Sequence, residues 1–557
     1  MTRRILLALA TILVLAAGAV AFLWWRVAPP DEILGLWTSG GVRVLAEPMR
    51  PFRGEERVLI LALDGVGDEA LRTALREGRL PRLNALVGGA EGDEYAHGYA
   101  APGVLSVLPS TTFAAWGSLY TGEPPGRTGV PGNEWFAREE MAFYAPAPVT
   151  VAGYEHATEV YTEDLLGGLL PVPTLFERAD VRSHVVLAHW YRGADLLVTP
   201  DPGMFAEIVA AAVAGLTTDR EVHREGYAEL DETAVDRALE AMEEHGVPDL
   251  QVVYFPGVDL FTHVATDPVP DQLGYLLDIV DPAIGEILDV YRAADVLDDT
   301  WIVVVGDHGH VGVLDDDRHA LGADGEDEPT AVLENTGFRL RPLELDSVPD
   351  DDYQAAVAYQ GAIAYVYLAD RSTCVETGNR CDWNRPPRLE EDVLPVVRAF
   401  DAASRTGEGV PELQGTLDLI FARENTPVGE DARAFRVWDG TRLVPVADYL
   451  AANPRPDLLE LESRLRDLAV GPRGHRAGDI LLLTRSGADR PVEERFYFSN
   501  PYRSWHGSPG EVESTIPLLV ARSDRSGADI RERVRQAVGP DPTQLSIAPL
   551  VLDLLGR

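Results

Sequence analysis

Short apolar runs that end in polar residues recur along the chain. Val58–Leu63 is almost entirely apolar and is followed directly by Asp64. Similar runs occupy 184–190, 248–259 and 299–310. An apolar run of this length, bounded by turn residues, predicts a strand that is buried on both faces, as in a parallel sheet.

Patterns of helical period lie between these runs. A long one covers 273–294, and a closing helix is predicted at 546–557. Two further strands are predicted at 478–484 and 515–522. The alternation of strands and helices predicts an α/β layered fold with a mostly parallel sheet. In such sheets, ligands bind at the carboxyl ends of the strands.

The stretch 311–475 has a different character. It is acidic, irregular and partly rich in Pro and Gly, with one clear strand at 362–368. We interpret it as a long insertion, or cap, that packs on the main sheet. The main α/β domain then comprises 57–310 and 476–557. Residues 27–56 are rich in Pro, Gly and Arg, and we expect a linker there.

Composition narrows the possible partners. The chain has 557 residues and a formal net charge of −42, and every strong cation is an arginine because the sequence contains no lysine. Such a protein lacks the basic face that nucleic-acid polymers and anionic lipids require, so we expect no binding to a nucleic-acid polymer. The absence of lysine also excludes a lysine nucleophile or Schiff base.

The N-terminal sequence predicts a segment that targets the chain to a membrane. Ile5–Trp25 carries no charge and is long enough to cross a bilayer as a helix. Arg3 and Arg4 favour a cytoplasmic N-terminus, with the rest of the chain outside the cytoplasm. Ala19–Ala21 resembles a signal-peptide cleavage site, and cleavage would give a periplasmic or secreted protein. We favour an uncleaved anchor in residues 1–26, because the apolar run continues past that site.

Two cysteines stand in the polar, turn-forming stretch "STCVETGNRCDWN". In an oxidising compartment we expect Cys374 and Cys381 to form a small disulfide loop. Two free thiols are the alternative. A thiolate metal site is disfavoured because the chain has no other cysteine to complete it.

Six carboxylates and imidazoles stand at or near the predicted strand ends. They are Asp64, Asp259, His263, Asp307, His308 and His506. Each residue alone is weak evidence for a metal site, since an Asp at a strand end is usually a helix cap. Asp259 and His263 are four residues apart and would share one face of a helix. Together, carboxylates and imidazoles suit Zn²⁺, Mn²⁺ or Fe²⁺.

Five segments stand in one order along the chain: "LALDGVG", "PSTTF…LYTGEPPGRTGVPGNEWF", "YFPGVDLFTHV", "VVVGDHGH" and "WHGSPGEVESTIPLLV". They resemble the alkaline phosphatase superfamily, and most closely its type I phosphodiesterase/nucleotide pyrophosphatase family. The resemblance runs from about residue 57 to the end, and 311–475 contributes little. It implies a three-layer α/β/α sandwich with a mostly parallel central sheet, in which 57–310 and 476–557 form the catalytic domain.

The resemblance also implies two divalent metal ions. We expect Zn²⁺, with Mn²⁺ as the alternative. One set of ligands would be Asp259, His263 and His506. The other would be Asp64, Asp307 and His308, completed by the oxygen of the nucleophile. Thr112, which precedes Phe113, matches the family's nucleophile, and Thr111 ranks second. Asn133 matches the asparagine that donates a hydrogen bond to a phosphoryl oxygen.

The chemistry agrees with these assignments. A threonine hydroxyl is a poor nucleophile at neutral pH, and a bound dication lowers its pKa. The N-terminus of a helix adds free N–H groups and a favourable dipole for anionic oxygens. The expected path is a phospho-threonine that water then hydrolyses.

Several residues depart from the family pattern or are ambiguous. His310 replaces the usual methionine, and either contacts the site from outside or is merely packed or exposed. Arg192 is a candidate substrate contact, although a surface salt bridge is equally expected. Trp190 stands where monoesterase relatives often carry a lysine, which favours a phosphodiester substrate. Phe113 and Trp135 either flank the leaving group or pack beneath the site.

Three alternatives remain open. The first is a phosphomonoesterase of the same superfamily. The second is a transferase that moves phospho-alcohol head groups on the outer membrane face. The third is an inactive binding protein on this fold. The expected substrate is a small phosphate ester, nucleotide-like or a lipid head group, and the sequence does not predict an oligomeric state.

Overall fold

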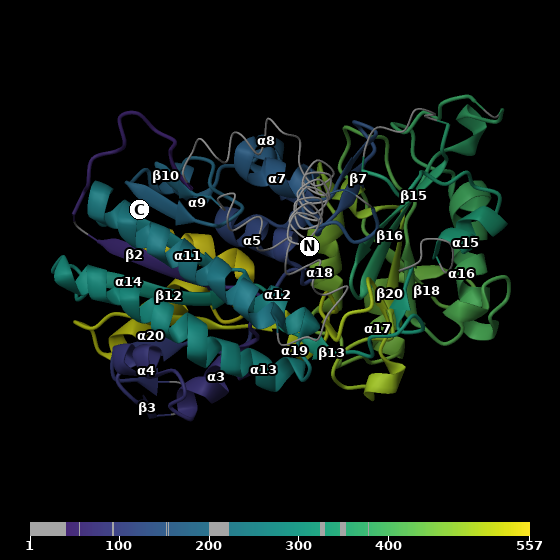
Figure 1. The fold of residues 1–557 in the computed structure, drawn as a ribbon. Helices are drawn as coiled ribbons and strands as arrows, with labels where there is room; N and C mark the ends of the chain where they lie inside the picture. The colour runs from purple at the N-terminus through teal and green to yellow at the C-terminus, as the bar shows by residue number, and fades with distance from the viewer. Residues whose placement is uncertain are drawn as a thin grey trace, which may run out of the picture.

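The computed structural model describes residues 41–54, 56–91, 94–151, 153, 155–199, 222–322, 329–345, 352–376 and 378–557 (Figure 1). The predicted anchor in residues 1–26 lies outside these described residues. Within the described ranges, no helix combines the length and the apolar character needed to cross a membrane.

The main sheet has ten strands in the order β1-β10-β9-β11-β2-β12-β24-β5-β4-β3. The five strands from β10 to β12 run parallel, and the strands at both flanks are antiparallel to their neighbours. The bounds, in sheet order, are Val42–Val44, Leu196–Val198, Ser183–Val186, Leu250–Phe255, Arg57–Leu63, Thr300–Gly306, Leu518–Ala521, Gly98–Ala100, Glu94–Tyr95 and Ala90–Glu91.

Helices cover both faces of this sheet, which confirms the α/β class and the layered arrangement. Figure 1 shows α11 and α14 crossing in front of the strands, and α20 and α21 pack against β24 and β2 on the other face. The helices of this part are α3 (Asp68–Arg76), α4 (Pro81–Val87), α5 (Thr112–Thr121), α6 (Pro125–Thr128), α7 (Glu155–Thr162), α8 (Leu165–Leu169), α9 (Leu175–Ala179), α11 (Val222–His245), α12 (Gly257–Val264), α13 (Pro268–Tyr275), α14 (Asp281–Ala293), α19 (Glu511–Ser514), α20 (Gly527–Val538) and α21 (Ile547–Leu554).

One part of the predicted linker is a strand instead. Val42–Val44 forms β1, which pairs with β10 at the edge of the main sheet. Downstream of it, the backbone N–H of Arg50 donates to the Asp195 carboxylate at 2.8 Å, and its guanidinium pairs with the same carboxylate at 2.9 Å. These partners are more than a hundred residues away, so the local sequence gave no sign of them.

The long insertion supplies five of the six strands of a second, antiparallel sheet, in the order β15-β16-β20-β17-β18-β19. Their bounds are Ala355–Gln360, Ile363–Leu368, Ile480–Thr484, Leu417–Ala422, Arg436–Trp438 and Leu443–Pro445. The helices beside it are α15 (Pro329–Asn335), α16 (Leu394–Thr406), α17 (Val446–Ala452) and α18 (Leu461–Ala469).

The position of β20 corrects the predicted domain division. The segment 478–484 is a strand, as predicted, but β20 pairs with β16 and β17 in the second sheet. The boundary expected at 475–476 therefore does not coincide with the boundary between the sheets. An apolar run indicates a buried strand, but it carries no information on which sheet the strand joins.

Short ribbons connect the two parts. β13 (Val311–Gly312) pairs with β22 (Ser504–Trp505), and β14 (Ala320–Leu321) pairs with β21 (Tyr497–Phe498). Two further short pairs lie within the main part: β6 (Val104–Leu105) pairs with β23 (Thr515–Ile516), and β7 (Trp135–Ala137) pairs with β8 (Ala142–Tyr144). The second sheet stands beside the main one rather than over its face (Figure 1). The predicted disulfide between Cys374 and Cys381 is present within the insertion.

Candidate active site

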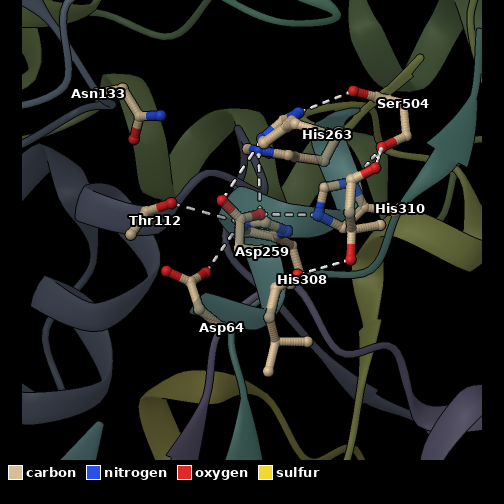
Figure 2. Close-up of polar contacts among 12 residues, drawn as sticks. Asp64, Thr112, Asn133, Asp259, His263, His308, His310 and Ser504 are labelled. Atoms are coloured by element: carbon tan, nitrogen blue, oxygen red, sulfur yellow. Dashed lines mark hydrogen bonds and ion pairs between the residues drawn. The ribbon is translucent and has the colours of Figure 1, made fainter. Parts of the chain in front are cut away.

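Six predicted ligands converge at one edge of the main sheet. Asp64 follows β2, Asp307 and His308 follow β12, and Asp259 and His263 lie on α12, directly after β11. These three strands are neighbours and parallel, so their carboxyl ends share one edge. His506 comes to the same place from the segment after β22 (Figure 2 shows the centre of this site). The six side chains belong to residues that are between 0 and 8 % exposed.

The structure brings these residues together in the two sets that the resemblance implied. One set contains Asp259, His263 and His506, and the other contains Asp64, Asp307 and His308. Within each set, one ligand atom of every residue lies within 4.8 Å of the others. A third, overlapping group joins Asp259 and His308 to His310.

Backbone groups orient the histidine ligands. Nδ1 of His263 lies 2.8 Å from the carbonyl oxygen of Ser504, and Nδ1 of His506 lies 2.9 Å from that of Ser110. With the proton on Nδ1, each ring presents its unprotonated Nε2 to the carboxylates, which is the arrangement of a metal ligand.

The two carboxylates of the second set are also held in place. The backbone N–H of Gly65 donates to Oδ1 of Asp307 at 3.0 Å, and the hydroxyl of Tyr254 donates to Oδ2 of Asp64. These bonds fix one oxygen of each carboxylate and leave the other oxygen toward the centre of the cluster.

The second oxygen of each of these two carboxylates shows whether the site fits a metal ion. Oδ1 of Asp64 and Oδ2 of Asp307 are buried, and no group in the described part of the chain hydrogen-bonds to them. Burial and the charges of Asp307 and Asp259 raise the pKa of Asp64 well above its usual value, and burial raises that of Asp307 to about 7. Buried, like-charged carboxylates with free oxygens are costly unless a cation compensates them. The residues present therefore fit divalent ions.

Two of the three ligand histidines have the protonation state of a metal ligand, whereas the pKa of His263 is raised because its charge interaction and hydrogen bond with Asp259 outweigh burial. Burial lowers the pKa of His308 to about 3 and lowers the pKa of His506 well below its usual value. Both rings are therefore neutral near pH 7, and the neutral imidazole is the form that coordinates metal ions.

Thr112 is the first residue of α5, and its hydroxyl faces the second set. Its Oγ1 lies 3.5 Å from Nε2 of His308, and Figure 2 shows it on the side of Asp64 and His308. Thr111 precedes the helix in an extended conformation, and its buried Oγ1 has no partner among the described residues. Of the two candidate threonines, Thr112 is the one directed at the cluster.

Asn133 lies across from Thr112 (Figure 2), and its amide is partly engaged. Its Oδ1 accepts a hydrogen bond from the backbone N–H of Phe113 at 3.2 Å. Its own backbone N–H donates to Oε1 of Gln360 at 2.7 Å. Gln360 ends β15 in the second sheet, so the insertion contacts the site directly. Gln360 could not be predicted as a site residue, because its partners are more than two hundred residues away in the sequence.

The structure corrects the assignment of Arg192 to substrate binding. Its guanidinium donates to the Glu177 carboxylate through Nε and Nη2, and to the carbonyl oxygens of Gly167, Leu170 and Val172. Five contacts use the five N–H groups that a guanidinium has, so none is left for a substrate. The salt bridge, which was the alternative, is the observed role.

The two aromatic candidates are packed side chains. Phe113 is buried against His189, with ring centroids 4.5 Å apart. Trp135 is fully buried and stacks on Tyr144 at 5.4 Å. Both observations favour packing beneath the site over contact with a leaving group.

His310 is buried in the site, where the sequence left its place open. Its Nε2 lies 2.7 Å from Oδ1 of Asp259, and its Nδ1 lies 3.0 Å from Oγ of Ser504. The signal available in the sequence was its position two residues after His308, at the end of β12.

The chain is similar to known proteins in sequence and in fold. A sequence profile described as "Type I phosphodiesterase / nucleotide pyrophosphatase" matches residues 58–376. No curated protein sequence matches the chain.

Two solved structures align with the chain. Murine ectonucleotide pyrophosphatase / phosphodiesterase 5, as an inactive variant in complex with AMP, aligns with a TM-score of 0.50 and 11% identity over 90% of this chain and 95% of that one. Phosphonoacetate hydrolase from Sinorhizobium meliloti 1021, in complex with phosphonoformate, aligns with a TM-score of 0.44 and 16% identity over 91% of this chain and 99% of that one. At 11% identity, the likeness to the murine structure concerns the fold alone.

Proposed function

The chain belongs to the type I phosphodiesterase/nucleotide pyrophosphatase family, and on this premise we propose that it is a two-metal phosphodiesterase that acts through Thr112. The observation that carries the proposal is the pairing of two buried ligand sets with a threonine hydroxyl at the start of a helix. The family supports a phosphoester hydrolase; the diester preference, the intermediate and the location are our inferences.

The ligand sets would hold one ion each. Asp259, His263 and His506 would bind the first, and Asp64, Asp307, His308 and the Thr112 oxygen would bind the second. Two divalent ions supply Lewis-acid stabilisation for the entering and leaving oxygens of a displacement at phosphorus.

The chain's own groups define the covalent path. Oγ1 of Thr112 attacks phosphorus, the bond from phosphorus to the leaving alcohol breaks, and a phospho-threonine diester forms. The proton that Thr112 loses is balanced by the proton that the leaving alkoxide gains. Water then cleaves the Thr112–phosphorus ester, which restores the hydroxyl and releases a phosphate monoester.

Asn133 and α5 would bind the phosphoryl oxygens. Because Oδ1 of Asn133 accepts from Phe113, the amide presents its Nδ2 hydrogens as donors. The N-terminus of the ten-residue helix α5 adds the positive end of its dipole at the attacking oxygen.

The shortage of positively charged side chains for phosphate binding favours a diester substrate. A terminal phosphate monoester carries a dianion, which needs more positive charge than a diester monoanion. The chain has no lysine, and the guanidinium of Arg192 is fully engaged with Glu177 and carbonyl groups. We therefore expect a diester or pyrophosphate with a nucleotide-like or head-group alcohol.

The proposed location is the outer face of a membrane, with the segment Ile5–Trp25 as the anchor. Its lack of charge and its flanking arginines support this location. The Cys374–Cys381 disulfide gives further support, since disulfides persist in oxidising compartments outside the cytoplasm.

The test uses the full chain, purified in detergent, and a pair of matched variants. Thr112→Val removes the proposed nucleophile and keeps the shape of the side chain, while Thr111→Val removes the neighbouring hydroxyl. Metal content and rates on bis(p-nitrophenyl) phosphate and p-nitrophenyl phosphate are measured for all three proteins. We expect about two ions per chain, a higher rate on the diester, and a rate loss of at least about 100-fold only in Thr112→Val.

Three results would overturn parts of the proposal. Full activity in Thr112→Val would remove Thr112 as the nucleophile. A much higher rate on the monoester would identify a phosphomonoesterase. A protein that binds two ions but hydrolyses neither ester would favour the inactive binding protein.

A further inference from the structure

A fourth buried histidine contacts the first ligand set without belonging to it. Nε2 of His310 lies 2.7 Å from Oδ1 of Asp259, which is closer than any ligand histidine comes to that carboxylate. The nearest of those, Nε2 of His263, lies 3.4 Å from Oδ2 of Asp259. The carboxylate therefore has one oxygen against His310 and the other against His263.

Ser504 connects the same two rings from behind. Its Oγ lies 3.0 Å from Nδ1 of His310, and its carbonyl oxygen lies 2.8 Å from Nδ1 of His263. Asp259, His263, Ser504 and His310 thus form a closed ring of polar contacts (Figure 2). Both nitrogens of His310 are engaged, which an imidazole that merely fills space would not require.

The chain makes room for this contact at Gly65. A Cβ atom at this position would lie 2.7 Å from Nε2 of His310 and 2.8 Å from Oδ1 of Asp259. Gly65 also has a φ of 69°, a conformation that glycine adopts readily. Only the absence of a side chain beside Asp64 lets His310 reach Asp259.

We propose that His310 is a positioning residue that fixes the Asp259 carboxylate for the first metal ion. The contact between Nε2 and Oδ1 restricts rotation of the carboxylate and keeps Oδ2 beside His263. The inference rests on the proposed two-metal function. Partners that orient a ligand in this way change metal affinity by about 10- to 100-fold when they are lost.

The variants His310→Leu and His310→Gln separate positioning from packing and from direct coordination. Leucine fills the space without a donor, whereas glutamine places an amide N–H close to where Nε2 of the ring stands. Zn²⁺ affinity is measured on the full chain by competition with a chromophoric chelator, together with the thermal midpoint of the metal-free protein.

In the wild type we expect two ions with separate affinities. His310→Leu should weaken one of the two by about 10- to 100-fold and leave the other within about threefold. His310→Gln should recover most of the loss. The metal-free variants should keep a thermal midpoint close to that of the metal-free wild type, because His310 is proposed to orient a metal ligand and not to stabilise the fold.

The results that would overturn the inference differ from those that would overturn the function. A wild type without two bound ions contradicts the two-metal function itself. Two ions in the wild type with unchanged affinities in His310→Leu contradict the positioning role. Equal losses in His310→Leu and His310→Gln would make His310 a ligand instead. If His310→Leu does not fold, Ser504→Ala removes the hydroxyl behind the ring and should weaken the same ion, and unchanged binding would count against the role.

Discussion

At the scale of single residues, one hydroxyl holds the Asp64 carboxylate in its orientation. Tyr254 donates to Oδ2 of Asp64, and the other oxygen has no partner among the described groups. The hydroxyl therefore sets the orientation in which Oδ1 faces the second ligand set.

Tyr254→Phe should lower metal affinity at the Asp64 set by about tenfold, because the carboxylate is then free to rotate. Tyr291→Phe is the matched control, since that buried hydroxyl donates to Gln251 at 2.7 Å instead. Chelator competition on both variants measures the effect. Equal metal affinities in the two variants would contradict the role of Tyr254.

A second residue-scale prediction concerns Asp231. This buried carboxylate accepts from the backbone N–H of Gly257 at 3.0 Å and from the Tyr275 hydroxyl at 2.9 Å. Burial raises its pKa to about 7. The folded state thus holds a proton that the unfolded chain releases near pH 4, so the contribution of Asp231 to stability falls as pH rises from about 4 to about 7.

Asp231→Asn should remove this dependence. The stability of the wild type relative to the variant should decline by at most roughly 1.4 kcal/mol per pH unit across that window. Urea unfolding of both proteins at several pH values measures the difference, in which the titration of all other groups cancels. A constant difference between pH 4 and pH 7 would contradict the assigned protonation.

The residues at strand ends were predictable from sequence for a physical reason. A buried parallel strand is apolar until it leaves the sheet, so Asp64, Asp259 and Asp307 stand out where the runs stop. His310 and Gln360 could not be assigned in this way. Their partners are remote in sequence, and only the folded chain brings them into contact.

At the scale of elements, the β15–β16 hairpin is the part of the insertion that contacts the site. Gln360 accepts from the backbone N–H of Asn133 and donates to the carbonyl oxygen of Glu134. In the same turn, the backbone N–H of Ala362 donates to the carbonyl oxygen of His506 at 3.2 Å. The hairpin thus joins the proposed phosphoryl-binding residue to a proposed metal ligand.

Gln360→Leu should lower kcat/KM by about tenfold or more, because Asn133 loses the bond that places its backbone. Gln354→Leu is the matched control. It removes another buried glutamine one residue before β15, whose amide donates to the Cys374 carbonyl oxygen at 3.2 Å. Both variants should lose about 1–3 kcal/mol of stability, and only Gln360→Leu should lose activity. Parallel kinetic losses would show that the effect is one of general stability.

Element identity was easier to predict than element pairing. The strands expected from the apolar runs at 58–63, 248–259 and 299–310 are present as β2, β11 and β12 and lie in the parallel centre of the sheet. β1 and β20 were placed wrongly, because pairing depends on backbone groups far away in the chain. A local apolar pattern does not indicate with which strand a given strand pairs.

At the scale of the whole molecule, the net charge of −42 makes self-repulsion a property of the entire chain. The Debye length falls from about 30 Å at 0.01 M salt to about 10 Å at 0.1 M. We expect NaCl to raise the thermal midpoint over this range, because it screens repulsion that is stronger in the folded state. Near the sequence pI of about 4.5 the salt effect should shrink. A midpoint that is independent of salt at pH 7 would contradict this expectation.

The order of the ligands along the chain determines when the site can be completed. Asp259 and His263 are synthesised before the second sheet, whereas His506 follows its last-synthesised strand, β20. A nascent chain that has left the ribosome as far as β20 therefore has two of the three residues of that set. The proposed set can be completed only after His506 has been synthesised, and a premature stop codon before His506 yields a chain that lacks one of its three residues.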